Sequence, residues 1–268
     1  MTTLLTRLTL AAGISLAAMS AALAEQIDVT FITASDMDTM SEDDGRGGVA
    51  RLAAVVKAER AKEGANTVFV FPGDLLSPSI LAGFDRGQHM IELLNMTPPD
   101  MLTPGNHEFD FGADVFRERM KEAQFPLLGT NIRENGEPVE PLVDTIMKEF
   151  KGAEQSVKVG FVGVTTPTTQ TTSSPGSITF LPVLETVNAA AAKLREDGAD
   201  LVVAAVHTHA EDDRALIANS GVDIVLSGHD HVLNVYFDGR KALVESKEEA
   251  EYVTMMDIAF DVTEGDRG

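Results

Sequence analysis

The sequence predicts an α/β fold, because segments with the pattern of strands alternate along the chain with segments whose apolar residues have helical spacing. One strand-like segment, residues 66–74 (NTVFVFPGD), is apolar at almost every position, which is typical of a strand buried on both faces. No internal repeat is visible. The roughly 240 residues that follow the first 24 suffice for one large α/β domain or two small ones with a substantial core. We therefore expect strands and helices in alternation around such a core.

The first half of the chain begins with a strand of mixed alternation at 26–36. The helix that follows, at 47–64, ends at a glycine stop and has four apolar residues at helical spacing, Val49, Leu52, Val55 and Val56. After the apolar strand, two more helices are expected on either side of the sequence PGNHEFDFG, at 87–96 and 113–123.

The second half continues the alternation. Strands are expected at 125–132, 156–166, 200–209 and 223–231, and helices at 186–198 and 213–221. The last two segments alternate like antiparallel strands around an Asp-Gly turn, at 232–245 and 251–262. The Thr/Ser/Pro-rich run at 165–177 is interpreted as a surface loop.

The first 24 residues have the pattern of a secretory signal peptide. A start with one cation and no acid (MTTLLTR) precedes a short apolar core (LTLAAGISLAA) and the small-x-small cleavage site at residues 22–24. A membrane-spanning helix would need roughly 20 apolar residues, which this segment does not supply. We expect cleavage before Glu25, export to the periplasm or outside the cell, and one domain at 25–268.

Composition limits the partners. Without cysteine, an exported chain must be held together by core burial, by metal, or by both. With 42 acidic and 21 basic residues, its surface repels nucleic acid polymers and anionic membranes. No second apolar run has membrane length, so no membrane contact is expected after signal cleavage. An anionic substrate needs a local reversal of charge, which bound cations would provide.

Five of the strand-like segments end in residues able to bind metal: Asp36 and Asp38, Asp74, Asn106 and His107, His207, and His229 and His231. Ligands of open α/β sheets bind beyond the carboxyl ends of strands. Each motif alone also has a structural explanation, as a turn, a cap or a hydrogen-bonded histidine. His-x-His is more specific, because alternate strand residues point to one face. Recurrence at five strand ends favours a metal site.

The donor types indicate a two-metal centre. Carboxylates, an amide and imidazoles suit divalent Mn, Zn, Fe, Co or Mg, and the lack of thiolate excludes soft-metal sites. The seven candidate ligands exceed what one tetrahedral ion needs and fit a pair of ions about 3.5–4 Å apart with a shared carboxylate.

With these residues in view, the sequence resembles the calcineurin-like metallophosphoesterases, and more closely the metallophosphatase domain of the bacterial 5′-nucleotidase / UDP-sugar hydrolase family. The motifs GDLLSPS, PGNHEFDFG and SGHDHV carry the resemblance, which extends from Asp28 to about Asp261. It implies a four-layer α/β/β/α sandwich of two mixed sheets flanked by helices, with the site at one edge.

The resemblance also implies roles for single residues. Asp36 and His231 would bind the first metal, Asp74 would bridge the pair, and the second metal would be bound by Asn106, His207 and His229. His107 would reach toward the phosphate, to stabilise the charge of the transition state or to protonate the leaving oxygen, while Asp110 holds its ring. A histidine oriented by a carboxylate is also, on physical grounds, a general-acid arrangement. His89 is assigned a structural or surface role, and His209 a place behind the ligands or in solvent.

The sequence departs from the family pattern twice. The family has Asp-x-His where this chain has Asp36-Met37-Asp38. Asp38 either ligates, which would shift preference from zinc toward Mn or Mg, or leaves a position open. The family also continues into a C-terminal nucleotide-specificity domain, which we expect this protein to lack, and the sequence has no Trp to stack on a base.

The expected function is that of an exported dinuclear phosphoesterase in nucleotide catabolism. It would hydrolyse 5′-nucleotides or related small phosphate esters by attack of metal-bound hydroxide on phosphorus. Alternatives on the same scaffold are a cyclic-nucleotide phosphodiesterase, a sugar-nucleotide pyrophosphatase and a thiosulfohydrolase. A truncated, non-catalytic metal-binding module is a further alternative, against which the His107/Asp110 pair argues.

Overall fold

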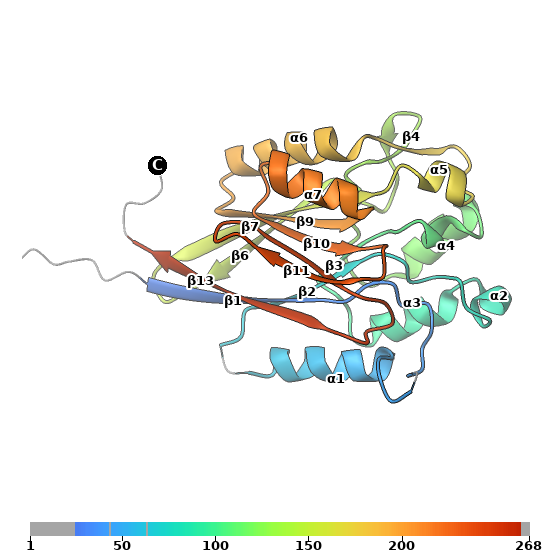
Figure 1. The fold of residues 1–268 in the computed structure, drawn as a ribbon, viewed down its shortest axis with the longest axis horizontal. Helices are drawn as coiled ribbons and strands as arrows, with labels where there is room; N and C mark the ends of the chain where they lie inside the picture. Colours follow the sequence, from blue (N-terminus) through green and yellow to red (C-terminus); the bar gives the residue numbers. More distant parts are fainter. Residues whose placement is uncertain (1–24, 43, 63, 264–268) are drawn as a thin grey trace, which may run out of the picture.

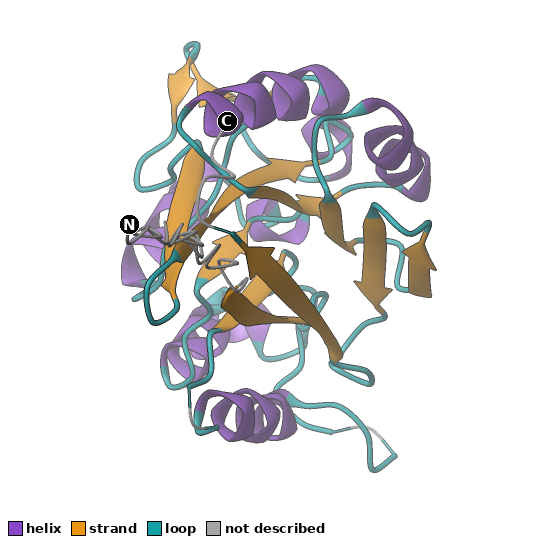
Figure 2. Ribbon diagram, turned by 90° about the vertical axis from the view of Figure 1, so that its left-hand side faces the viewer, coloured by secondary structure: helices purple, strands orange, loops and turns teal. Residues whose placement is uncertain are grey.

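The computed structural model describes residues 25–42, 44–62 and 64–263, and these form four layers (Figure 1). Two β-sheets face each other, and helices cover the outer face of each, as the side view shows (Figure 2). The predicted α/β/β/α sandwich of two mixed sheets is thus confirmed. Within the described residues, no helix combines the length and the apolar character needed to cross a bilayer. The predicted signal peptide, residues 1–24, lies outside the described residues.

The first sheet has the strand order β13-β1-β2-β3. Its strands are β1 (Glu25–Thr33), β2 (Thr67–Pro72), β3 (Met101–Thr103) and β13 (Thr254–Val262). Strands β1, β2 and β3 are parallel, whereas β13 runs antiparallel to β1. The carboxyl ends of the three parallel strands therefore lie along one edge.

The second sheet has the order β11-β12-β10-β9-β7-β6. Its strands are β6 (Thr145–Lys151), β7 (Ser156–Thr165), β9 (Leu201–His207), β10 (Ile224–Gly228), β11 (Leu233–Phe237) and β12 (Ala242–Ser246). The four inner strands are parallel and the two edge strands antiparallel to their neighbours. The predicted antiparallel pairing around the Asp-Gly turn is the β11–β12 hairpin.

A small third sheet and the helices complete the fold. The small sheet consists of β4 (Ile132–Glu134), β5 (Glu137–Pro138) and β8 (Ile178–Phe180). The helices are α1 (Val49–Arg60), α2 (Ala82–Asp85), α3 (Gln88–Asn95), the 3₁₀ turn η1 (His107–Phe109), α4 (Ala113–Glu122), α5 (Thr169–Thr172), α6 (Val183–Glu196) and α7 (Ala210–Asn219).

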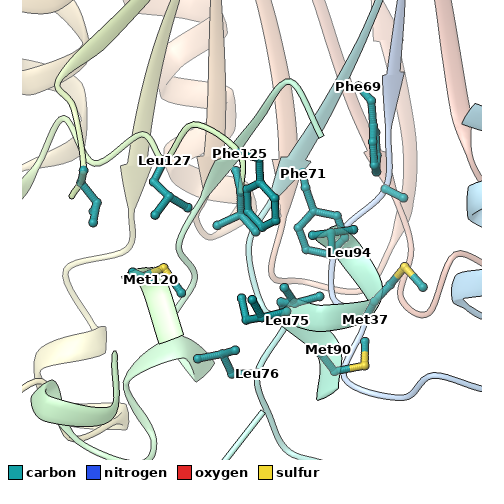
Figure 3. Packing of buried hydrophobic residues seen from close by; sticks show 14 of the residues in the cluster. Met37, Phe69, Phe71, Leu75, Leu76, Met90, Leu94, Met120, Phe125 and Leu127 are labelled. Carbon is teal, nitrogen blue, oxygen red and sulfur yellow. The ribbon is translucent and has the colours of Figure 1, made fainter. Parts of the chain in front are cut away.

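The alternation of β2 shows why its whole sequence is apolar. Phe69 and Phe71 point toward the helices of the first layer, where they pack with residues such as Leu94 of α3 (Figure 3). Val68 and Val70 point the other way, into the core between the two sheets. Both faces of the strand are buried from Val68 to Pro72, which explains why these five residues are all apolar. A third core lies between the second sheet and helices α6 and α7.

The prediction of a strand at 125–132 is wrong. Leu127 and Leu128 each form only one isolated bridge, to Leu102 and Val143 respectively. The backbone N–H groups of this segment donate to three separate parts of the chain: Leu128 to Leu102, Gly129 to Val143 and Thr130 to Gly163. No continuous ladder can form, although the apolar pattern resembles that of a strand.

The interpretation of 165–177 as a surface loop is only partly right. The run contains the short helix α5, and Thr166 and Thr169 within it are fully buried. The hydroxyl group of Thr169 donates to the carbonyl of Thr166 at 2.7 Å. Threonine can be buried here because its hydroxyl finds a nearby backbone acceptor.

Asp100 links three layers of the fold, and its replacement tests their coupling. Its carboxylate accepts hydrogen bonds from Arg60 of α1 at 2.8 Å, from the Phe69 amide at 2.9 Å and from Lys148 of β6. Burial raises the pKa of Asp100, but the bonds from Lys148 and Phe69 outweigh it, so the pKa is lowered overall. A lowered folded-state pKa stabilises the fold above the unfolded value of about 3.9, and this contribution is lost as the pH falls through the folded value.

We therefore expect Asp100→Asn to lower the free energy of unfolding at pH 7 by about 1–3 kcal/mol. The difference from the wild type should shrink below about pH 4. Urea unfolding at pH 7 and below about pH 4 measures this difference in the free energy of unfolding. The exposed Glu154→Gln is the control, and its free energy of unfolding should change little. An equal loss at both pH values would show that the charge of Asp100 is not what matters.

Candidate metal centre

The predicted ligands meet where the two sheets face each other. Asp36, Asp74 and Asn106 follow β1, β2 and β3 of the first sheet, while His207 ends β9 and His229 follows β10 of the second. Because these strands are parallel within each sheet, their carboxyl ends deliver the side chains to one edge of the sandwich. The recurrence of such residues at strand ends therefore indicated their proximity correctly.

Two glycines allow the turns to approach this closely. A Cβ at Gly105 would lie 2.1 Å from Oδ1 of Asp74, and a Cβ at Gly228 would lie 2.8 Å from Oδ2 of Asp36. Real Cβ atoms do not approach other atoms to such distances, so these positions accept only glycine. The Pro-Gly and Ser-Gly pairs are thus more than turn residues, because they bring the ligands together.

Several of the predicted ligands adopt a backbone conformation that residues with side chains rarely accept. Asp36, Asp74, His229 and His231 have φ angles of 55°, 56°, 103° and 56°. Residues in such strained conformations cluster at functional sites, where the surrounding structure holds them. The expectation that His229 and His231 converge by strand alternation is wrong, because β10 ends at Gly228 and both follow it in the turn.

The four ligands expected for the second metal form a buried cluster. Nε2 of His207 lies 2.9 Å from Oδ2 of Asp74, 3.2 Å from Oδ1 of Asn106 and 3.2 Å from Nδ1 of His229. The ligand atoms of Asp74, His207 and His229 lie within 4.8 Å of one another, which fits a single ion. His207 donates from Nδ1 to the carbonyl of Pro72 at 2.9 Å, which directs Nε2 into the cluster.

The electrostatics of the cluster favour cations. Burial lowers the pKa of His207, but the charge of Asp74 and its hydrogen bond outweigh burial and raise the pKa to about 10. Burial and the neighbouring His207 and His209 lower the pKa of His229 to about 4, so this ring is neutral and free to act as a ligand. The raised pKa of His207 thus reflects the negative charge of Asp74, and His229 supplies a neutral nitrogen ligand beside it.

Among the residues expected for the first metal, His231 and Asp38 are more exposed, whereas Asp36 is buried. Nε2 of His231 is 3.4 Å from Oδ1 of the buried Asp36. Asp38 is half-buried and forms a hydrogen bond with Glu249. Burial and this hydrogen bond raise the pKa of Glu249 to about 8. These groups line a cavity of about 210 Å³, together with Asp74, Ser77, Pro78, His107 and Glu248.

His107 faces the same cavity but belongs to a different arrangement. Its Nδ1 donates to Oδ2 of Asp110 at 2.6 Å, and this carboxylate also accepts the hydroxyl of Ser77 at 2.6 Å. The hydrogen bond to Asp110 raises the pKa of His107 to about 9, so the ring is protonated on both nitrogens and positively charged at neutral pH. With Nδ1 bonded to Asp110, Nε2 remains for a substrate.

Glu108 is a residue of the motif to which the sequence assigned no role. Its buried carboxylate accepts hydrogen bonds from the backbone amides of Asp74, Leu75, Leu76 and Gly105. It therefore fixes the turn after β2 to the turn after β3. A lone acid between His107 and an apolar residue gave no sign of burial.

One further residue, Asp213, supports the second sheet's side of the site. Asp213 of α7 is buried and accepts the hydroxyls of Thr208 and Ser227, each at 2.6 Å, which ties the turn after β9 to β10. Burial raises the pKa of Asp213 to about 6. His89, in contrast, lies in α3 and bonds Asp85 at 2.8 Å, which fits its predicted structural role.

The geometry agrees with the comparison to known families. Residues 29–233 match the family model of the calcineurin-like phosphoesterases. The chain belongs to that family. Its members use divalent metals to cleave phosphate esters, which is consistent with the donor set of the buried cluster.

Relatives of this phosphoesterase include nucleotidases. It is 32% identical over 200 residues to the snake venom 5′-nucleotidase of Crotalus adamanteus, covering 74% of this chain and 34% of the relative. It is 28% identical over 212 residues to the 2′,3′-cyclic-nucleotide 2′-phosphodiesterase/3′-nucleotidase of Yersinia enterocolitica, covering 69% and 32%. The chain thus spans about a third of the length of the curated relatives it matches.

Solved structures show the same fold. The calcineurin-like phosphoesterase YfkN from Bacillus subtilis superposes with a TM-score of 0.75 at 22% identity, covering 90% of this chain and 87% of that one. At this identity the likeness concerns the fold. The fold of the phosphoesterase is therefore shared with a solved chain that it covers almost completely.

Proposed function

We propose that the chain is an exported phosphoesterase with two divalent ions that hydrolyses 5′-nucleotides or related small phosphate esters. The observation that carries this proposal is the placement of the His107–Asp110 pair beside the Asp36, Asp74 and His231 side chains in one cavity. Metal binding alone does not need a histidine oriented by a carboxylate, whereas phosphoryl transfer uses one.

In this proposal the residues divide between two ions. Asp36 and His231, with Asp38 as a further oxygen donor, would hold the first ion, and Asp74 would contribute to both ions. Asn106, His207 and His229 would hold the second ion. Bound divalent ions supply Lewis acidity, which lowers the pKa of water and offsets the negative charge of the phosphate.

In the reaction, the chain's own residues hold the His107 ring in position and supply a proton from it to an oxygen of the substrate. Asp110 holds the His107 ring through Nδ1, and the protonated Nε2 donates toward a phosphoryl oxygen or the leaving oxygen. Ser77 holds Asp110 in turn. The buried position of Asp74 and His207 keeps water out of the rear of the site.

The substrate class rests on the nucleotidase relatives. Their names include a 5′-nucleotidase and a 2′,3′-cyclic-nucleotide phosphodiesterase, so cyclic nucleotides are the second candidate. Export rests on the signal-peptide pattern of residues 1–24.

The proposal predicts metal-dependent phosphate release, and chelation tests it. In Mn²⁺, the purified protein is expected to release phosphate from 5′-AMP and to cleave bis-p-nitrophenyl phosphate, and EDTA should abolish both activities. Cleavage of the aryl ester alone would mean a working centre with another substrate, and 2′,3′-cyclic AMP is then the next compound to assay. A metal-loaded protein that cleaves none of the three contradicts the proposal and favours a binding module.

A further inference from the structure

A second cluster of possible ligands lies on the solvent side of His229. Nε2 of His229 is 3.1 Å from Nδ1 of His209, and this nitrogen is 3.5 Å from Oδ1 of Asp230. Ligand atoms of all three residues lie within 4.8 Å of one another. The proposed centre uses only the other nitrogen of His229, Nδ1, which faces His207. His209 and Asp230 therefore have no role in the function proposed above.

The spacing within this outer cluster matches that of ligands around one ion. Zinc binds imidazole nitrogen at 2.0–2.1 Å, so two ligands of a tetrahedral ion are about 3.3 Å apart. The two distances of 3.1 and 3.5 Å lie on either side of this value. Two imidazoles and a carboxylate are a ligand set that zinc and similar borderline ions prefer.

The side chains are also held from behind, as ligands of metal sites usually are. Asp230 accepts the backbone amide of Ala210 through Oδ2 at 2.7 Å, which leaves Oδ1 toward His209. Nε2 of His209 lies 3.4 Å from the hydroxyl of Thr168, so that Nδ1 points into the cluster. His209 stacks edgewise on His229 with ring centroids 4.3 Å apart. The arrangement is therefore fixed before any ion arrives.

We propose that His209, His229 and Asp230 form a third metal site, which takes a zinc-like divalent ion with water in its fourth position. His209 has 45% of its side chain exposed and Asp230 has 29%, so this ion exchanges with solvent and binds more weakly than ions of the buried cluster. A neutral imidazole has one lone pair and one N–H group, so an outer ion that takes the lone pair of Nε2 leaves the proton of His229 on Nδ1 and withdraws this ring from the inner ion. Excess zinc should therefore lower the activity.

Counting bound zinc tests the site independently of any activity. Isothermal titration of the metal-free protein with Zn²⁺ is expected to show one weak equivalent that His209→Gln and Asp230→Asn both lose. Asparagine keeps an oxygen for the Ala210 amide, so Asp230→Asn should preserve the start of α7. Glu211→Gln removes an exposed acid from the same turn of α7 and should retain the weak equivalent.

Two outcomes would overturn the proposal. The first is an equal number of zinc equivalents in the wild type and both variants. The second is the loss of a tight equivalent instead of the weak one, which would mean that His209 and Asp230 only orient His229 for the inner cluster. Since the test compares numbers of ions, it holds whatever substrate the phosphoesterase cleaves and however many ions the inner centre binds.

Discussion

Replacing His107 by asparagine is expected to leave metal binding intact and to lower turnover by roughly 10²–10⁴-fold. The ring contacts Asp110 and the cavity, and it takes no part in the buried cluster of Asp74, His207 and His229. The contact that His107 makes with Asp74 comes from its backbone amide, at 2.8 Å, and this amide remains in the variant. The loss should therefore fall on the chemical step.

Two measurements on the same sample separate an effect on metal binding from an effect on turnover. They are the metal content by mass spectrometry and the steady-state cleavage of bis-p-nitrophenyl phosphate. His89→Asn is the matched control, because His89 lies in α3 and bonds only Asp85 and its own helix. It should leave both quantities unchanged. A His107→Asn protein that lost its metal would place His107 among the ligands and refute the catalytic role.

Glu108→Gln is expected to lower the free energy of unfolding by about 3–5 kcal/mol. Each carboxylate oxygen of Glu108 accepts two backbone amides: Oε1 those of Leu75 and Leu76, and Oε2 those of Asp74 and Gly105. Whichever way a glutamine amide is turned, its NH₂ group faces two N–H donors. Two buried amides then lose their acceptor, and each costs about 1–3 kcal/mol.

The same change should weaken metal binding, since the displaced amides belong to the turns that carry Asp74 and Asn106. Urea unfolding of the metal-free protein measures the stability, and Mn²⁺ titration measures the affinity. Glu196→Gln, at the exposed end of α6, makes the same chemical change without a buried partner and should have little effect. If Glu108→Gln unfolded like this control, the four amide contacts would not be what fixes the turns.

The layers of the fold could be predicted because the pattern of each element reflects its burial. Residues 68–72 of β2 are apolar on both faces, and α1 and α4 follow the expected helical segments closely. Residues 125–132 could not be assigned correctly, because their apolar pattern records burial but not that the hydrogen bonds go to three different segments. The same limit applies to Thr169, whose burial depends on a local acceptor that composition does not reveal.

Some features of the candidate site could be predicted from the sequence and others could not. The residue types at strand ends were visible in the sequence, and the parallel order of the strands explains why Asp74 and His207 meet. The left-handed turns at His229 and His231 were not visible, because φ angles above zero are expected for glycine and not for histidine. Glu108 and Asp230 were not identified either, since their roles depend on backbone amides that lie near them only in the folded chain.

The 2.9 Å contact between Asp74 and His207 joins the end of β2 in one sheet to the end of β9 in the other. An ion bound by both residues would be a cross-link between the sheets, in a chain that has no cysteine to form a disulfide. By mass action, such an ion favours the folded state by about 2.7 kcal/mol when its free concentration is about 100 times its dissociation constant. The same ligands would then make the lifetime of the fold depend on the supply of metal, so that starvation for the ion exposes the protein to unfolding and proteolysis as well as to loss of activity.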